Sequence, residues 1–194
     1  RDISARKRAE EALRRSEEQY RSIFNASADG MVLRDTDFRV VDVNAAYVAL
    51  TGYARNEVVG RVGTITTPPE LEETMRALHR RALAGERVSI ETRGMFKDGT
   101  PVELEIRGVP MQRDGEPHVL YIGRDISARK KAEEALRSSE EQYRSIFNAA
   151  QDSMVLRDAD FRIVDVNTAY EATSGRKREE VIGLEDLTLT RNSA

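Results

Sequence analysis

Cysteine and tryptophan are absent from this 194-residue sequence, and histidine occurs only twice. Without cysteine, disulfides, thiolate metal sites and cysteine nucleophiles are excluded, and the absence is typical of a reducing compartment. His79 and His118 have no histidine or cysteine partner at ligand spacing. The sequence therefore predicts no metal site.

Long apolar runs and an excess of basic charge are also missing. No run approaches the roughly 20 residues that cross a bilayer, and no signal-peptide pattern opens the sequence. We therefore expect a cytoplasmic fragment, with the option of a membrane anchor elsewhere in the parent protein. The 31 basic and 34 acidic residues give a net charge of −3. Because no basic block would follow a phosphate backbone, nucleic-acid binding is disfavoured.

What the sequence does contain is a long internal repeat. Residues 1–61 align without a gap with residues 124–184, and 45 of 61 positions are identical. A repeat of this length is a whole domain with its connector rather than a short solenoid unit. We expect a piece of a longer tandem array: a connector helix at 1–24, a complete domain at 25–125, a second connector helix at 126–147, and the N-terminal half of another domain at 148–194. That half should leave an open sheet edge and half a core.

The two connectors are rich in Ala, Glu and Arg and contain neither Pro nor Gly, which favours helix. A weak apolar stripe runs along them at alternating four- and three-residue steps, as in coiled coils. The stripe predicts a homodimer through these helices, and the alternative is a solvated charged connector. Its members are Ala9, Leu13, Tyr20, Ile23, Leu136, Tyr143 and Ile146.

Between the connectors the pattern mixes helix and strand. Residues 31–33 and 38–43 alternate as a hairpin. Asn44 is a preferred N-cap for a short helix that Gly52 ends, and a single turn at 56–59 and an amphipathic helix at 70–84 follow. Residues 87–96, 102–107 and 119–122 alternate as strands. This order predicts an α+β domain with a five-stranded antiparallel sheet and helices on one face.

Three stretches, in order, carry a family resemblance: VVDVNAAYVALTGYARNEVVGR at 40–61, FKDGTPVELEIRGVP at 96–110 and YIGRDISARKKAEEALR at 121–137. Together they resemble the PAS domain family, whose members are sensory and dimerisation modules in bacterial sensor kinases and cyclic-dinucleotide enzymes. The third stretch resembles the last strand of that family with its Asp-Ile-Thr hinge and signalling helix. The resemblance implies a signal hinge at Arg124, Asp125, Ile126 and Ser127. Asp125 or Ser127 would cap the helix that follows.

The resemblance also raises the question of a cofactor. Flavin-thiol photoreceptors of this family carry a cysteine soon after the pair that Gly60-Arg61 resembles, and here none exists. The haem ligand of haem-binding members would fall near Thr74. His79 lies five residues later, about 140° around the helix, so we expect a surface or partly buried histidine there and a strand-edge residue at His118. Non-covalent flavin is disfavoured by the absence of tryptophan, and no cofactor is predicted.

The space between sheet and helices is then either a filled core or a small-ligand pocket, and the sequence leaves both open. Alternating apolar positions and a few polar ones are expected to line it: Met31, Leu33, Val41, Val43, Tyr47, Leu50, Thr51, Met75, Leu78, Ile90, Thr92, Leu104, Leu120 and Ile122.

Enzyme motifs are not found in the sequence. It has no P-loop, dinucleotide-binding glycine pattern, HExxH, phosphoacceptor histidine motif or GGDEF signature, so no catalytic residue is predicted. Any kinase or cyclase activity would lie in output domains outside this chain. The expected function is sensory relay, in a multi-PAS protein of sensor histidine kinase or diguanylate cyclase type. The alternative is a ligand-free dimerisation or spacer domain.

Overall fold

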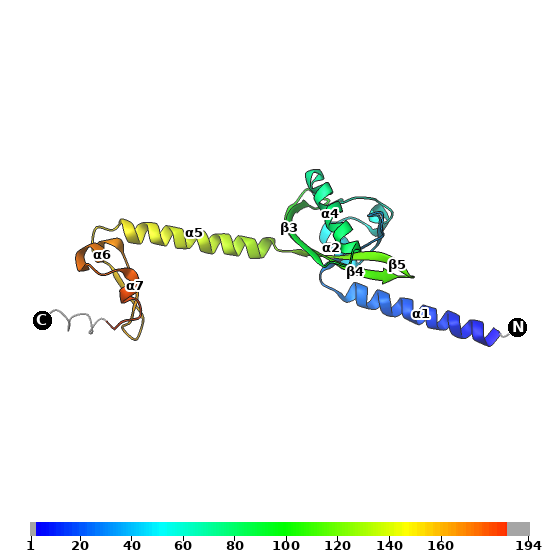
Figure 1. Cartoon of the computed structure of the whole chain (residues 1–194), viewed down its shortest axis with the longest axis horizontal. Coiled ribbons are helices and arrows are strands. Elements are labelled where there is room, and N and C mark those ends of the chain that lie inside the picture. Colours follow the sequence, from blue (N-terminus) through cyan, green and yellow to red (C-terminus); the bar gives the residue numbers. More distant parts are fainter. Residues whose placement is uncertain (1–2, 186–194) are drawn as a thin grey trace. The chain divides into compact units, whose positions relative to one another are not determined.

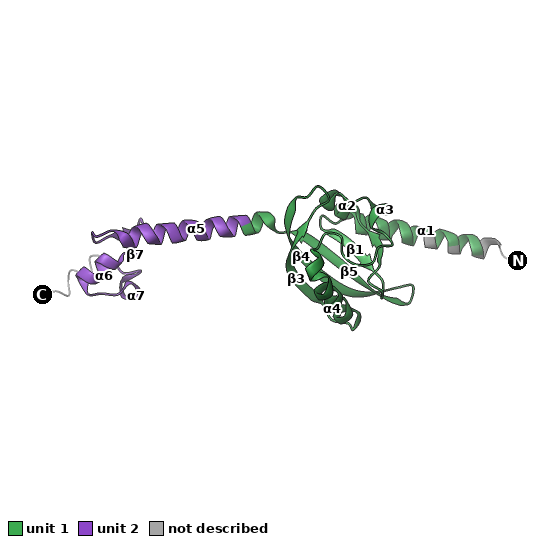
Figure 2. Cartoon of the chain, turned by 90° about the horizontal axis from the view of Figure 1, so that it is seen from above, with its two compact units in different colours: residues 1–130 green, residues 131–194 purple. Residues whose placement is uncertain are grey.

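The computed structural model describes residues 3–185, which fall into two compact units within residues 1–130 and 131–194 (Figure 2). The first unit contains α1 (Ile3–Ala26), β1 (Gly30–Arg34), β2 (Val40–Val43), α2 (Ala45–Thr51), α3 (Arg55–Val58), the 3₁₀ turn η1 (Pro69–Leu71), α4 (Glu72–Leu83), β3 (Val88–Met95), β4 (Pro101–Arg113) and β5 (Glu116–Asp125). Helix α5 (Ser127–Ala149) follows β5 after a single residue.

The five strands of the first unit form one antiparallel sheet in the order β2-β1-β5-β4-β3. Helices α2 and α4 pack on one face of it (Figure 1). The predicted α+β class and five-stranded sheet are confirmed. Strand β5 lies in the centre, paired with β1 on one side and β4 on the other. It is longer than the predicted 119–122 because it pairs with β4 along its whole length.

Helix α2 begins and ends at the residues that the sequence predicts. The side chain of Asn44 accepts a hydrogen bond from the backbone N–H of Tyr47, and Gly52 takes the left-handed conformation at φ 77°. A side chain with a Cβ is disfavoured at that φ, so glycine ends the helix at little cost. The repeat forms the same motif: Asn167 caps the helix that Gly175 closes.

The C-terminal turns of α1 contact the rest of the first unit. Phe24 is buried, and the side chain of Asn44 donates a hydrogen bond to its carbonyl oxygen at 3.0 Å. The guanidinium of Arg113 in β4 lies 5.7 Å from the ring centre of Tyr20, a cation–π contact. The C-terminal end of this connector is therefore fixed to the sheet and to α2.

The second unit repeats the early elements: β6 (Val155–Arg157), β7 (Ile163–Val166), α6 (Thr168–Ser174) and α7 (Arg178–Val181). Its buried core consists of Ile163, Val166 and Val181. Residues 131–185 contain no counterpart of β3, β4 and β5. Phe161 is accordingly 69% exposed, whereas Phe38, at the matching position of the first unit, is 2% exposed.

None of the helices within residues 3–185 combines the length and the apolar character that a membrane span needs.

Candidate functional site: an inner pocket and a strand-to-helix junction

A cavity of about 60 Å³ lies between the sheet and the helices of the first unit. Five of the residues expected from the sequence line it: Tyr47, Leu50, Thr51, Met75 and Leu104. The loop at residues 64–67 forms a further wall that sequence reasoning missed, because loop residues carry no periodic signal. Its sequence is Thr-Ile-Thr-Thr, so the wall adds hydroxyl groups to an otherwise apolar lining.

The sequence pattern assigned the wrong face of strands β1 and β5 to the cavity. Met31 pairs with Ile122 and Leu33 with Leu120, and these four side chains lie on the sheet face away from the cavity. The cavity is instead lined by the alternate positions of these strands and of β4: Gly30, Val32, Arg34, Ile106, Tyr121 and Gly123. A shift of one residue moves every side chain to the other face. Leu33 on the far face is only 1% exposed, so both faces of β1 are apolar and alternation could not identify the inner one.

The remaining predicted pocket residues also do not line the cavity. Val43 belongs to a core cluster with Val40, Tyr47 and Val58. Leu78 and Ile90 pack against a second cluster that contains Phe38 and Met75. Val41 is half-buried and Thr92 is buried, with its hydroxyl donating to the Arg93 carbonyl.

The pocket contains a buried cation, Arg34, which is 7% exposed. Its Nη1 donates to the carbonyl oxygens of Phe38 at 2.7 Å and Gly63 at 2.8 Å. The Phe38 ring centre lies 4.3 Å from the guanidinium carbon. Burial lowers the pKa of Arg34 to about 10, so it is still charged near neutral pH. Sequence reasoning missed this residue because an arginine in a hairpin is normally exposed.

His79 is a core residue, which corrects the expected surface or partly buried position. It is 3% exposed and its ring packs against Phe38 and Tyr121. Nε2 lies 2.8 Å from the Asp35 carbonyl oxygen, and Nδ1 lies 3.0 Å from the Tyr121 hydroxyl. Because a carbonyl only accepts, Nε2 carries the proton and Nδ1 accepts from the tyrosine. Both ring nitrogens therefore have partners within the protein.

His79 should make folding stability depend on pH. Burial lowers its pKa, the Asp35 carbonyl partly opposes this, and the cations Arg34 and Arg76 add to the lowering. The unfolded chain then binds more protons than the folded protein as pH falls below about 6.5. The stability advantage of wild type over His79→Gln should shrink there, by at most about 1.4 kcal/mol per pH unit. Urea unfolding of both proteins between pH 8 and pH 5 measures it, and a pH-independent difference would contradict the assignment.

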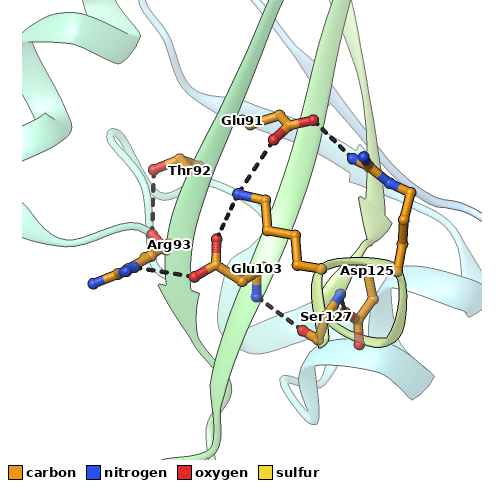
Figure 3. A network of polar contacts seen from close by, with 8 residues as sticks. Glu91, Thr92, Arg93, Glu103, Asp125 and Ser127 are labelled. Atoms are coloured by element: carbon orange, nitrogen blue, oxygen red, sulfur yellow. Dashed lines mark hydrogen bonds and ion pairs between the residues drawn. The ribbon is translucent and has the colours of Figure 1, made fainter. Parts of the chain in front are cut away.

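The predicted hinge residues lie together at the junction of β5 and α5. The carboxylate of Asp125 accepts a hydrogen bond from the backbone N–H of Ser127 at 2.8 Å, which caps the start of α5 (Figure 3). The Ser127 hydroxyl accepts from the backbone N–H of Glu103 at 3.0 Å, and the N–H of Ile126 donates to the Glu103 carbonyl at 2.9 Å. Ile126 is 4% exposed. The junction is therefore bonded to β4 through both the backbone N–H and the backbone C=O of Glu103.

Ion pairs extend this attachment onto the first turn of α5. The ammonium group of Lys130 lies 2.9 Å from Glu103 and 3.2 Å from Glu91, and Arg129 pairs with Glu91 at 2.8 Å. The hydrogen bond from Lys130 lowers the pKa of Glu103 and raises that of the lysine. Figure 3 shows Glu91 and Glu103 on neighbouring strands, turned toward the start of the helix.

At the other end of the hinge, Arg124 forms a two-bond ion pair with Asp29, at 3.0 and 2.7 Å. Hydrogen bonding by Arg124 holds the pKa of Asp29 below its usual range. Asp29 lies between α1 and β1, so the start of the domain is tied to its exit strand.

The connector stripe is only partly available to another chain. Ile23, Leu136 and Ile146 are 68%, 63% and 68% exposed. Tyr20 instead stacks on Phe24 and contacts its own domain, which corrects its place in the stripe. Tyr143 is 41% exposed and its hydroxyl donates to Asp165. The side chains of Ala9 and Leu13 lie outside the described part of the structure.

Comparisons with known proteins agree with this architecture. A family model described as PAS fold matches residues 18–126, and one described as PAS domain matches residues 141–193. The chain is 28% identical over 181 residues to sporulation kinase E of Bacillus subtilis, covering 93% of this chain and 24% of that protein. It is 29% identical over 143 residues to the sensor histidine kinase TmoS of Ectopseudomonas mendocina, covering 72% and 15%. The chain thus spans a quarter or less of these relatives.

A solved structure of a PAS domain has a similar fold. The PAS domain of an HTR-like protein from Haloarcula marismortui superposes with a TM-score of 0.53 at 26% identity. The match covers 62% of this chain and 99% of that one, so the likeness is that of one whole domain.

Proposed function

Because the chain belongs to the PAS-fold family, we propose that residues 25–125 are the sensory module of a signalling protein and relay the state of the inner pocket to helix α5. The module would work in the reducing cytoplasm that a cysteine-free sequence favours. A continuous path of contacts leads from the pocket along β5 to α5.

The observation that carries the proposal is that pocket and hinge share one strand. Tyr121 and Gly123 of β5 line the cavity, and β5 ends at Asp125, which caps α5. Only Ile126 separates the strand from the helix, and it is buried. Because no flexible loop separates β5 from α5, a shift of the strand would move the start of the helix.

The direction of α5 is set by the same contacts. Glu103 holds the hinge through its backbone N–H and C=O and holds Lys130 through its side chain. A small rotation of β4 or β5 would break or re-form these bonds and turn the helix. Packed interfaces switch between discrete arrangements rather than deform continuously, so a small change in the pocket can select one of two helix directions. The helix spans about 34 Å at 1.5 Å per residue.

The output is proposed to be a kinase. Sporulation kinase E and TmoS are kinases by name, and the chain aligns with part of each. A diguanylate cyclase is the other output type that the family resemblance allows. In either case this chain would supply no catalytic group, and the activity would reside in another part of the parent protein.

Dimerisation through the connectors is proposed as part of the same mechanism. Leu136 and Ile146 are exposed on α5, and apolar side chains at such spacing are stabilised by a partner helix. The cysteine-free chain allows a direct check: Leu136→Cys should cross-link under mild oxidation faster than Ser138→Cys, which lies about 200° around the helix. Equal rates at both positions would contradict a seam at Leu136.

A screen distinguishes relay from the competing function of a ligand-free spacer. Small molecules are tested for a rise in the melting temperature of the full chain, which mass action predicts for any binder of the folded state. Hydrogen exchange at residues 126–131 is then compared with and without each hit. The relay predicts changed exchange there, and Leu50→Phe, which fills the pocket, should abolish the response. Binders that leave the hinge unaffected would contradict the relay, and the absence of any binder would favour the spacer.

A further inference from the structure

The pocket arginine lacks a charge partner. Within residues 3–185, no carboxylate forms an ion pair with Arg34, and its hydrogen bonds go only to the carbonyls of Phe38 and Gly63. Both bonds are made by Nη1, so the other guanidinium nitrogens make none. Burying a charge is costly unless a counter-charge and further hydrogen bonds compensate it. A site that keeps such a cation is prepared for an anion.

The acid next to it in sequence does not fill this role. One carboxylate oxygen of Asp35 accepts hydrogen bonds from the backbone N–H groups of Asp37 and Arg39, at 3.0 and 2.9 Å. These bonds hold the hairpin turn. The other charged group close to Arg34 is Arg76, a second cation whose carboxylate partner is Glu72. Among the described residues that line the cavity, Arg34 is therefore the one that carries a charge.

The remaining lining selects the size and shape of the anion. Leu50, Met75 and Ile106 present apolar surface. Burial raises the pKa of Tyr47 and of Tyr121 to about 12, so both phenols keep their protons, and that of Tyr121 is already donated to His79 Nδ1. A cavity of about 60 Å³ has room for roughly four to six non-hydrogen atoms, at 10–15 Å³ per water-sized position. A phosphate or a dicarboxylate would bring a second charge that the described lining does not balance.

We propose that this pocket binds a small aliphatic monocarboxylate, between acetate and butyrate in size, with its carboxylate on Arg34 and its tail against α2 and α4. The guanidinium suits this ligand because its planar donors match the two oxygens of a carboxylate. The inference rests on the proposed sensory function and names the class of ligand that the same pocket would report.

The repeat keeps the residue that would bind the carboxylate and changes a residue that would contact the tail. Arg34 and Tyr47 recur as Arg157 and Tyr170, whereas Leu50 is replaced by Thr173. The residue type at the anchor position is the same in both units, although Arg157 is exposed where Arg34 is buried, and a position facing the tail differs. We therefore expect the second unit to differ in the tail that it prefers rather than in the charge.

Thermal unfolding of the full chain tests the proposal, with acetate, propionate and butyrate as probes and propionamide as the uncharged control. Propionate should raise the melting temperature in a saturable way, and propionamide should not. Arg34→Met should reduce propionate affinity at least about tenfold, as expected when a charge-assisted pair is lost. Arg76→Met is the matched control, because its guanidinium contacts the same Phe38 ring without lining the cavity, and it should keep the response.

Equal stabilisation by propionamide, no stabilisation by any of the three carboxylates, or an unchanged response in Arg34→Met would overturn the proposal. If Arg34→Met does not fold, the longer-tailed hexanoate takes its place as the test: it should fail to bind wild type and should bind Leu50→Ala, which enlarges the pocket. Hydrogen exchange at residues 126–131 in the same samples separates the two claims. Propionate that binds without changing the hinge supports the ligand class and contradicts the relay.

Discussion

Asn44→Ala is expected to destabilise the sensor domain by about 3–4 kcal/mol, because four backbone partners lose their bonds at once. The side chain of Asn44 is 0% exposed. Its oxygen accepts from the N–H groups of Met31 and Tyr47, and its nitrogen donates to the carbonyls of Phe24 and Asp29. A single amide thus joins α1, β1 and α2. Each buried group left unpaired costs about 1–3 kcal/mol, reduced where water can enter.

Urea unfolding followed by circular dichroism measures this loss, and the melting temperature should fall by at least about 12 °C. Asn25→Ala is the matched control. Asn25 accepts one hydrogen bond, from Ala45, at an exposed site. Its loss should cost about 1 kcal/mol or less. Similar losses in the two variants would mean that Asn44 acts as an ordinary helix cap and does not join three elements.

Ile126→Ala should release the first turn of α5 from the sheet while most of the domain stays folded. Ile126 is 4% exposed and lies between the strand and the helix. Truncating a buried isoleucine costs about 2–5 kcal/mol. Amide exchange at residues 128–131 should accelerate about 30-fold or more, since 1.4 kcal/mol corresponds to a factor of ten.

Leu136→Ala provides the comparison, because Leu136 is the same kind of aliphatic side chain on the same helix but is 63% exposed. Exchange at residues 128–131 should be unchanged in that variant. If Ile126→Ala also leaves exchange unchanged, the hydrogen bonds of Glu103 and Ser127 alone hold the junction and the packing of Ile126 is dispensable.

Local signals made the fold predictable from the sequence. Asn44 and Gly52 determine the bounds of α2 through capping and a left-handed φ, and these effects depend on neighbours a few residues away. The hinge is also local: Asp125 caps a helix that starts two residues later. The long repeat made the connectors recognisable, because the same helix pattern appears twice.

The pocket depended on information that no local pattern carries. Both faces of β1 are buried, so the choice between Leu33 and Val32 as the inner residue is made by the helices that pack on the sheet. The positions of Arg34 and His79 follow from contacts across 29 to 44 residues, with Gly63, Tyr121 and Asp35. Burial of these polar groups is tolerated only because distant backbone and hydroxyl groups satisfy them.

The central claim is that the pocket and α5 are mechanically coupled, and a distance measurement between spin labels tests it most directly. The cysteine-free chain accepts labels at Thr36→Cys, on the exposed hairpin turn, and at Ser138→Cys on α5. Labelled chain is diluted with unlabelled chain so that each dimer carries one pair. Leu50→Phe then fills the pocket, and Ala49→Leu adds bulk to the exposed side of the same helix. The account predicts a shifted distance distribution for Leu50→Phe and none for Ala49→Leu. Superimposable distributions for wild type and Leu50→Phe would contradict it.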